Sequence, residues 1–185
     1  MVIKNSVTLV INKLPNLEKS FEELSKLDLL VGVPSDKTER KDINEPNNST
    51  IAYINDNGSP AMRIPQRSFM RPGVSDAREY IIKRLKKGGK EILQGDVDSV
   101  YNTFVACGLA IQNAIRKRIN DGIPPPLSQR TLEERVANRT AIKGAQAEID
   151  RRAAGEQPGI DLAKPLVATG QLRNSITYVI RERFK

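Results

Sequence analysis

Two apolar stripes at helical spacing place the strongest constraint on the fold of this chain. One stripe runs from Ala77 to Ile92, and the longer one runs from Val97 to Ile119 and includes Cys107. Apolar residues repeated every three or four positions lie on one face of a helix, and that face has to be buried. Gly95 and Asp96 stand between the stripes as a turn and a helix cap. The pattern predicts two long helices separated by this turn, with Cys107 as a buried thiol.

Alternating apolar and polar residues predict short strands near the two ends of the chain. Residues 7–11 alternate, and the apolar run 28–33 stops at Pro34. A tight turn at Thr169-Gly170 is expected to start a closing strand that continues to Arg181. The apolar even positions of that strand are Leu172, Ile176, Tyr178 and Ile180. The predicted fold class is therefore α+β, with a small antiparallel β-sheet packed against two long helices and a charged helical arm or insertion.

The length of 185 residues predicts a single domain over residues 1–185. The polar stretch at about 35–49 has little to bury and is expected to be a mobile loop. A charged, alanine-rich helix is expected within 132–154, as part of a helical insertion over about 132–160. Ser128 is a candidate cap for it, and Thr131 to Glu134 has capping-box spacing.

Two shorter helices are expected from their apolar spacing. One runs from Asn16, which acts as its cap, to Leu27. The other covers 50–57, is capped by Ser49 or Thr50, and ends at Gly58 in a left-handed conformation. The following segment, 59–72, contains three prolines, which favour an extended path or one further short strand.

The residue types argue against catalysis. The chain has no histidine, which is the commonest general base and metal ligand near neutral pH. Carboxylate pairs occur in charged or capping contexts that solvation explains, and Cys107 lies on an apolar stripe. We therefore expect no enzyme activity, no cofactor and no metal. The pairs are Glu22 with Glu23, Asp96 with Asp98, and Glu133 with Glu134.

The formal charge of +8 favours acidic partners, including nucleic acid. The basic residues are spread among acidic ones, however, and aromatic residues are few, so a solvated basic surface is favoured over a dedicated nucleic-acid site. The N-terminus does not resemble a secretory signal, and no run approaches the ~20 apolar residues of a membrane span. A single cysteine indicates a reducing compartment, such as the bacterial cytoplasm.

Three blocks of residues carry a family resemblance. The first joins Ala52–Gly58, similar to Ala-x-x-Asn-Glu-Phe-Gly, with Ile64–Pro72, similar to Ile-Pro-x-Arg-Pro-Phe-Leu-Arg. The second is the proline-rich segment Asp121–Thr131, and the third is Lys164–Tyr178, which contains Thr-Gly-x-Leu-Arg-x-Ser-Ile. In this order the blocks resemble the tail-completion (head-tail joining) neck proteins of tailed bacteriophages. The chain departs from the family pattern at Asn57, Ser68 and Ala168.

The resemblance implies a structural virion protein of the phage neck, assembled in the host bacterial cytoplasm. Such proteins form a ring, expected to be hexameric, between the connector and the tail. The implied partners are further copies of the chain, connector or adaptor proteins, and tail terminator or tube proteins, with genomic DNA passing nearby and no membrane involved. Two alternatives stay open: a tail terminator that caps the tail tube, and a basic nucleic-acid-binding protein.

Arginines and one aromatic residue are the candidate interface residues, because Arg and aromatic side chains contribute strongly to interfaces. In the alternative interpretation, Phe69 fills the chain's own core and the arginines are solvated. The arginines near the C-terminus are expected on the outer face of the last strand, where acidic protein partners are favoured over DNA. The candidates are Arg63, Arg67, Phe69, Arg71, Arg173, Arg181 and Arg183.

Overall fold

The computed structural model describes residues 14–34 and 46–183. Contacts divide these residues into two compact units. The hairpin unit comprises residues 14–31, 77–111 and 178–183, and the cleft unit comprises residues 32–34, 46–76 and 112–177. The expected strand at 7–11 and residues 35–45 of the expected loop lie outside the described residues. A single domain over 1–185 stays a prediction.

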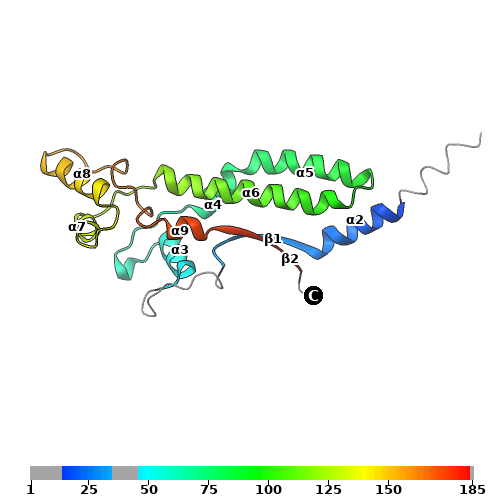
Figure 1. Cartoon of the computed structure of the whole chain (residues 1–185), viewed down its shortest axis with the longest axis horizontal. Helices are drawn as coiled ribbons and strands as arrows, with labels where there is room; N and C mark the ends of the chain where they lie inside the picture. Colours follow the sequence, from blue (N-terminus) through cyan, green and yellow to red (C-terminus); the bar gives the residue numbers. More distant parts are fainter. Residues whose placement is uncertain (1–13, 35–45, 184–185) are drawn as a thin grey trace, which may run out of the picture. The chain divides into compact units, whose positions relative to one another are not determined.

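Helices dominate the described residues, and two strands form a small antiparallel sheet, so the predicted α+β class is confirmed. The strands are β1 (Leu27–Gly32) and β2 (Thr177–Glu182). The helices are labelled in Figure 1. They are α2 (Leu14–Lys26), α3 (Asn48–Asn57), α4 (Met70–Asp76), α5 (Arg78–Leu93), α6 (Asp98–Asp121), α7 (Gln129–Ala137), α8 (Ile142–Ala153) and α9 (Gln171–Ser175).

The hairpin unit is built on α5 and the first part of α6, which lie side by side (Figure 1). Gly95 has a φ of 89° in the turn between them, as expected for a glycine that allows the chain to reverse. The stripe on α6 is buried at Val100, Cys107 and Ile111, which confirms the prediction for this helix. The stripe on α5 is less complete, because Leu85 is 46% exposed.

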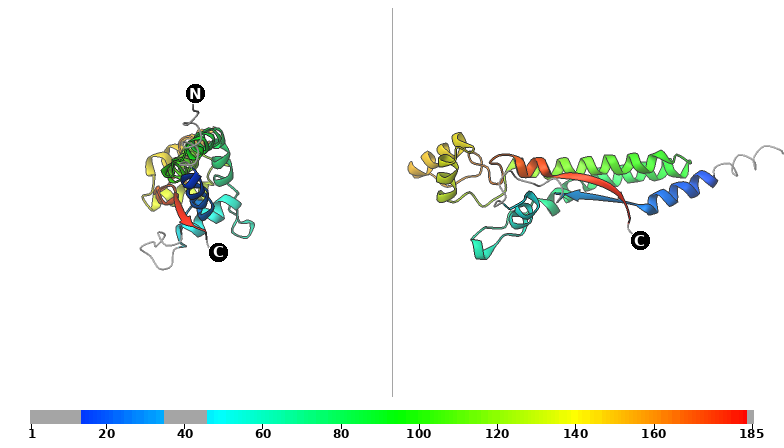
Figure 2. Two further views of the ribbon diagram at one scale, coloured as in Figure 1. Left: turned by 90° about the vertical axis from the view of Figure 1, so that its right-hand side faces the viewer. Right: turned by 60° about the horizontal axis from the view of Figure 1, so that its bottom comes forward.

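The two-stranded sheet packs on α6 within the hairpin unit, and the right-hand view of Figure 2 shows β1 and β2 side by side. The N–H of Arg183 donates to the carbonyl oxygen of Lys26 at 2.6 Å, which extends the antiparallel pairing beyond the strands. Leu29 and Tyr178 point toward Gly108 of α6. Leu30 and Val179, at the alternate positions, are exposed. The predicted alternation therefore holds within β2.

In the cleft unit, α7 and α8 pack against each other around a buried cluster (Figure 1). The single helix expected within 132–154 is wrong, because the chain turns at 138–141 and Arg139 and Ala141 have positive φ. A helix rotates about 100° per residue, so Leu132 and Ala145 would lie on nearly opposite faces of one continuous helix. Two helices bring both side chains into the same cluster.

The expected closing strand is wrong over 171–176, because these residues form the short helix α9 and its C-cap. Gly170 precedes the helix with a φ of 77°. Leu172 and Ile176 are 6% and 0% exposed. A spacing of four residues keeps two side chains on the same face in a strand and in a helix alike. The apolar pattern therefore identified the buried residues but not the conformation.

The N-terminal boundaries of the shorter helices differ from the expected ones. Because α2 begins at Leu14, Asn16 lies inside the helix and is not its cap. In α3 the cap is Asn47, whose Oδ1 accepts the N–H of Thr50 at 2.8 Å, rather than Ser49 or Thr50. Gly58 follows α3 with the expected positive φ of 79°, but its ψ of 168° lies outside the left-handed helical region that was predicted.

The segment 59–72 does not follow one continuous extended path. Residues Pro60–Met62 form a single 3₁₀ turn, and Arg63 follows with a φ of 55°. Residues 65–69 have no regular secondary structure, and α4 begins at Met70. Pro72 lies in the first turn of α4, where the missing N–H costs no helical hydrogen bond.

Candidate partner-binding cleft

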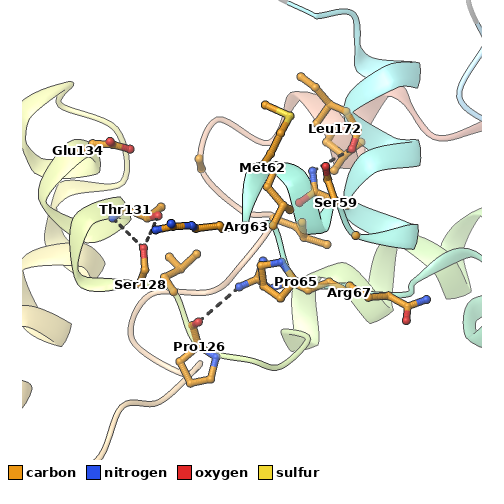
Figure 3. A pocket seen from close by; sticks show the side chains of 18 of the residues that line it. Ser59, Met62, Arg63, Pro65, Arg67, Pro126, Ser128, Thr131, Glu134 and Leu172 are labelled. Atoms are coloured by element: carbon orange, nitrogen blue, oxygen red, sulfur yellow. Dashed lines mark hydrogen bonds between the residues drawn. The ribbon is translucent and has the colours of Figure 1, made fainter.

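A cleft of about 1310 Å³ lies within the cleft unit. One wall comes from the end of α3 and the turn that follows it, and the opposite wall comes from the beginning of α7. The segment that leads into α9 contributes Leu166, and α9 itself contributes Leu172. Figure 3 shows Arg63 and Arg67 on the first wall and Ser128, Thr131 and Glu134 on the second.

The first wall is a tight turn closed by backbone hydrogen bonds. The N–H of Ser59 donates to the carbonyl oxygen of Ile64 at 2.8 Å, and the N–H of Ile64 donates to that of Ser59 at 2.9 Å. Gly58 is required before the turn, because a Cβ there would lie 2.9 Å from the nitrogen of Gln66 and the φ is positive. This turn presents the exposed side chain of Arg63 to the cleft.

Arg67 joins the first wall to the proline-rich segment. Its Nε and Nη2 donate to the carbonyl oxygen of Pro125 at 3.2 and 2.9 Å, and Nη2 also donates to that of Pro126 at 3.4 Å. The residue is only 6% exposed, and burial lowers the pKa of its guanidinium. Arg67 is thus a positively charged side chain engaged by neutral carbonyl groups.

Arg135 of α7 brings a second partly buried charge to the cleft. Its Nη1 donates to the carbonyl oxygens of Lys164 at 3.2 Å and Val167 at 3.4 Å. Burial, and then the nearby charge of Arg67, lowers the pKa of Arg135. Two guanidinium groups therefore lie close enough to repel each other, and both bind backbone carbonyls.

The cleft has a positive balance of charge. Its lining contains four arginines and a single acidic residue. That residue, Glu134, accepts a hydrogen bond from Nε of Arg130 at 2.8 Å on the α7 surface. Its charge is therefore already paired, and the cleft can attract anionic groups.

A part-buried capping contact fixes the path of the chain beyond Arg67. The carboxylate Oδ1 of Asp56 accepts the N–H groups of Phe69 at 2.8 Å and Met70 at 3.0 Å. These donors lie at the start of α4, where backbone N–H groups lack helical partners. Phe69 is 0% exposed and belongs to the core of the cleft unit. Its burial fits the interpretation in which it fills the chain's own core.

The structure brings only two of the sequence-predicted interface residues, Arg63 and Arg67, into the cleft. Arg71 is exposed on α4 and does not line it. Arg173 lies on α9 instead of a strand, and its Nη1 donates to Oδ1 of Asn120 at 3.0 Å. Phe69 is buried, and we assign it to the packing of this unit. Arg67 is also mostly buried and supports the fold through its carbonyl contacts, but it still lines the cleft.

The two remaining candidates belong to the hairpin unit. Arg181 is exposed on β2. Arg183 pairs with Asp28 of β1, with its Nη2 2.9 Å from Oδ1. The sequence analysis did not identify Arg130 and Arg135 as cleft residues, because their local sequence is that of an ordinary charged helix. It also missed Asp56, whose capping partners lie thirteen and fourteen positions along the chain.

The described residues were also searched for metal-binding groups, reactive thiols and membrane-spanning helices. Residues 14–34 and 46–183 contain no group of three or more side chains suited to hold a metal ion. Cys107 is buried, which raises the pKa of its thiol, although Arg84 acts in the opposite direction. Across the same residues, none of the helices has the length and apolar character needed to span a membrane.

The chain was compared with family models, curated proteins and solved structures. No family model, no curated protein and no solved structure matches the chain.

Proposed function

We propose that this chain is a structural subunit of the neck of a tailed bacteriophage, a tail-completion protein that assembles into a ring between the connector and the tail. The observation that carries the proposal is the meeting of the three resembling blocks in one folded unit. Residues 52–58, 64–72, 121–131 and 164–178 are distant in sequence, yet all of them except Tyr178 belong to the cleft unit.

Specific contacts join these blocks. Arg67 in the first block binds the carbonyl oxygens of Pro125 and Pro126 in the second. Helix α3 of the first block contacts α9 of the third. Lys164, at the start of the third block, donates from Nζ to the carbonyl oxygen of Asn120 at 2.7 Å, next to the second. This convergence supports the view that the blocks are parts of a single structural signature.

Assembly into a ring requires surface that a subunit by itself leaves open. The outer face of the two-stranded sheet exposes Leu30 at 42% and Val179 at 44%, and α2 exposes Phe21 at 52%. Within the described residues the sheet has two strands, and sheets this small are marginally stable without further packing. In a ring, each subunit uses one face against a different face of its neighbour. The sheet face is suited to be one of these two surfaces.

The test is electron microscopy of particles produced by phage in which the gene for this chain is interrupted. The proposal predicts filled heads and finished tails that remain separate, and joining when the purified protein is added. Tails of irregular length without finished ends would support the tail-terminator alternative instead. Normally joined virions would exclude both functions.

A further inference from the structure

We propose that the cleft binds an acidic peptide segment of a partner protein, whose carboxylates pair with Arg63, Arg67 and Arg135 and whose apolar side chains contact the walls. The inference rests on the cleft itself and does not require the neck function. Three features of the cleft carry it: charge without a counter-ion, free donors, and apolar walls.

The first feature is uncompensated charge. In residues 14–34 and 46–183, no carboxylate lies within ion-pair distance of Arg67 or Arg135, and their hydrogen-bond acceptors are carbonyl oxygens. A guanidinium removed from water without an opposite charge is costly, because carbonyl dipoles replace only part of its hydration. An arriving carboxylate would supply the missing charge.

The second feature is the set of donors that remains. A guanidinium carries five N–H donors in a planar fork. Within the described residues, the acceptors engage Nε and Nη2 of Arg67 and Nη1 of Arg135. Nη1 of Arg67, and Nε and Nη2 of Arg135, have no protein acceptor there. These groups, with the exposed guanidinium of Arg63, are able to donate to carboxylate oxygens, and such charge-assisted bonds are among the strongest in proteins.

The third feature is the apolar part of the walls, which distinguishes a peptide from other anions. Met62, Ile64 and Leu172 line the cleft beside the arginines. The volume of about 1310 Å³ exceeds that of ordinary small-molecule sites, so it is far larger than one phosphate group requires. The lining contains no aromatic side chain on which a nucleic-acid base would stack. An extended segment with acidic and apolar side chains matches both parts of the lining.

The experiment measures fluorescence anisotropy of a short fluorescein-labelled peptide of alternating glutamate and leucine, titrated with the full chain at fixed salt. A second peptide has glutamine in place of glutamate. We expect the glutamate peptide to bind, and the glutamine peptide to bind roughly tenfold more weakly or worse, because each lost charge-assisted hydrogen bond affects affinity on that scale. Equal binding of the two peptides, or no binding of the glutamate peptide, would overturn the proposal.

Variants locate the binding. Arg63→Gln removes an exposed cleft charge and is expected to weaken binding roughly tenfold. Arg71→Gln is the matched control, because it removes another exposed charge from the same unit outside the cleft, and less than a twofold change is expected. Arg135→Lys retains the charge but loses the planar fork, and we expect it to weaken binding while circular dichroism stays unchanged. An equal loss of affinity in the Arg63 and Arg71 variants would place binding on the general basic surface, against the proposal.

A DNA probe and a phosphate competitor test the chemical class of the ligand. A fluorescein-labelled DNA duplex that binds in a manner sensitive to Arg63→Gln, while the glutamate peptide does not bind, would replace the peptide with nucleic acid. Displacement of the peptide by inorganic phosphate, but not by chloride at equal ionic strength, would reveal a phosphate site instead. We expect that Arg63→Gln does not change any binding of the DNA duplex and that phosphate does not displace the peptide.

Discussion

The carboxylate of Glu148 and the guanidinium of Arg152 form a buried ion pair on α8, with Nε 2.9 Å from Oε1. Glu148 is 0% exposed, and its carboxylate also binds Arg151 and the N–H of Gly159, the latter at 3.0 Å. Arg152 in turn donates from Nη2 to the carbonyl oxygen of Leu127 at 2.9 Å, just before α7. This carboxylate therefore connects α8 with the loop after it and with the start of α7.

The first prediction concerns the loss of this charge. Glu148→Gln should lower the free energy of unfolding by about 3 kcal/mol, because its removal leaves the guanidinium of Arg152 without a counter-ion, whereas Arg151 keeps Asp161. Urea unfolding followed by circular dichroism is the measurement. Glu156→Gln, at an exposed position shortly after α8, is the matched control and should change the stability by less than about 0.5 kcal/mol. Equal effects of the two substitutions would contradict the role assigned to Glu148.

The second prediction concerns pH. Burial by itself raises the pKa of Glu148, but the Gly159 N–H and the charges of Arg152 and Arg151 outweigh it, so the pKa of the folded state is lowered. The unfolded state then binds more protons than the folded state, and stability falls as the pH drops below the ordinary glutamate value of about 4.3. The wild-type chain should lose more stability than Glu148→Gln over this range. Parallel pH profiles of the two proteins would contradict the prediction.

Residues whose surroundings are local were predictable from the sequence. The stripe on α6 led to the burial of Val100, Cys107 and Ile111, because an apolar helical face has few alternatives to burial. The spacing of Leu172 and Ile176 identified buried positions, but it fits both helical and strand periods. The conformation there depends on contacts with α3, which lies more than a hundred residues earlier in the chain.

Residues whose surroundings come from distant segments were not predictable. Arg67 was expected at a surface, and it is buried because carbonyl groups 58 and 59 positions later accept its hydrogen bonds. From the sequence alone, Arg135 is typical of a solvated charge on a helix surface. Only the folded structure shows that the carbonyl oxygens of Lys164 and Val167 accept its hydrogen bonds. The cleft arises from these long-range contacts, and no local pattern in the sequence encodes it.

The third prediction distinguishes Arg67 from Arg71, both of which were predicted from the sequence as interface residues. Arg67→Ala should destabilise the chain by about 1.5–3 kcal/mol, because the part-buried hydrogen bonds from the guanidinium to the carbonyl oxygens of Pro125 and Pro126 are lost. Arg71→Ala, at an exposed position, should stay within about 0.5 kcal/mol of the wild type. Thermal unfolding of each variant provides the measurement. Equal stability of both variants would show that Arg67 does not support the fold.

The fourth prediction tests the packing of the sheet on α6. A Cβ on Gly108 would lie 2.5 Å from Cδ2 of Tyr178, so Gly108→Ala should cost about 1–3 kcal/mol through overpacking. Gly89→Ala on α5 is the control, because a Cβ there meets no atom within 4 Å. That substitution should stabilise the helix by up to about 1 kcal/mol. Urea unfolding should therefore give effects of opposite sign, and effects of the same sign would contradict the packing.

The fifth prediction tests the sheet face as an assembly surface. Val179→Thr adds a hydroxyl to the exposed side of β2, where burial against a neighbouring subunit would leave that hydroxyl without a partner. Val74→Thr is the matched control, because Val74 on α4 is 42% exposed and Val179 is 44% exposed. Light scattering after size-exclusion chromatography should show a shift toward monomer for Val179→Thr alone. If both variants assemble as the wild type does, the ring uses another surface. If the wild type itself remains monomeric at high concentration, ring formation without partner proteins is excluded.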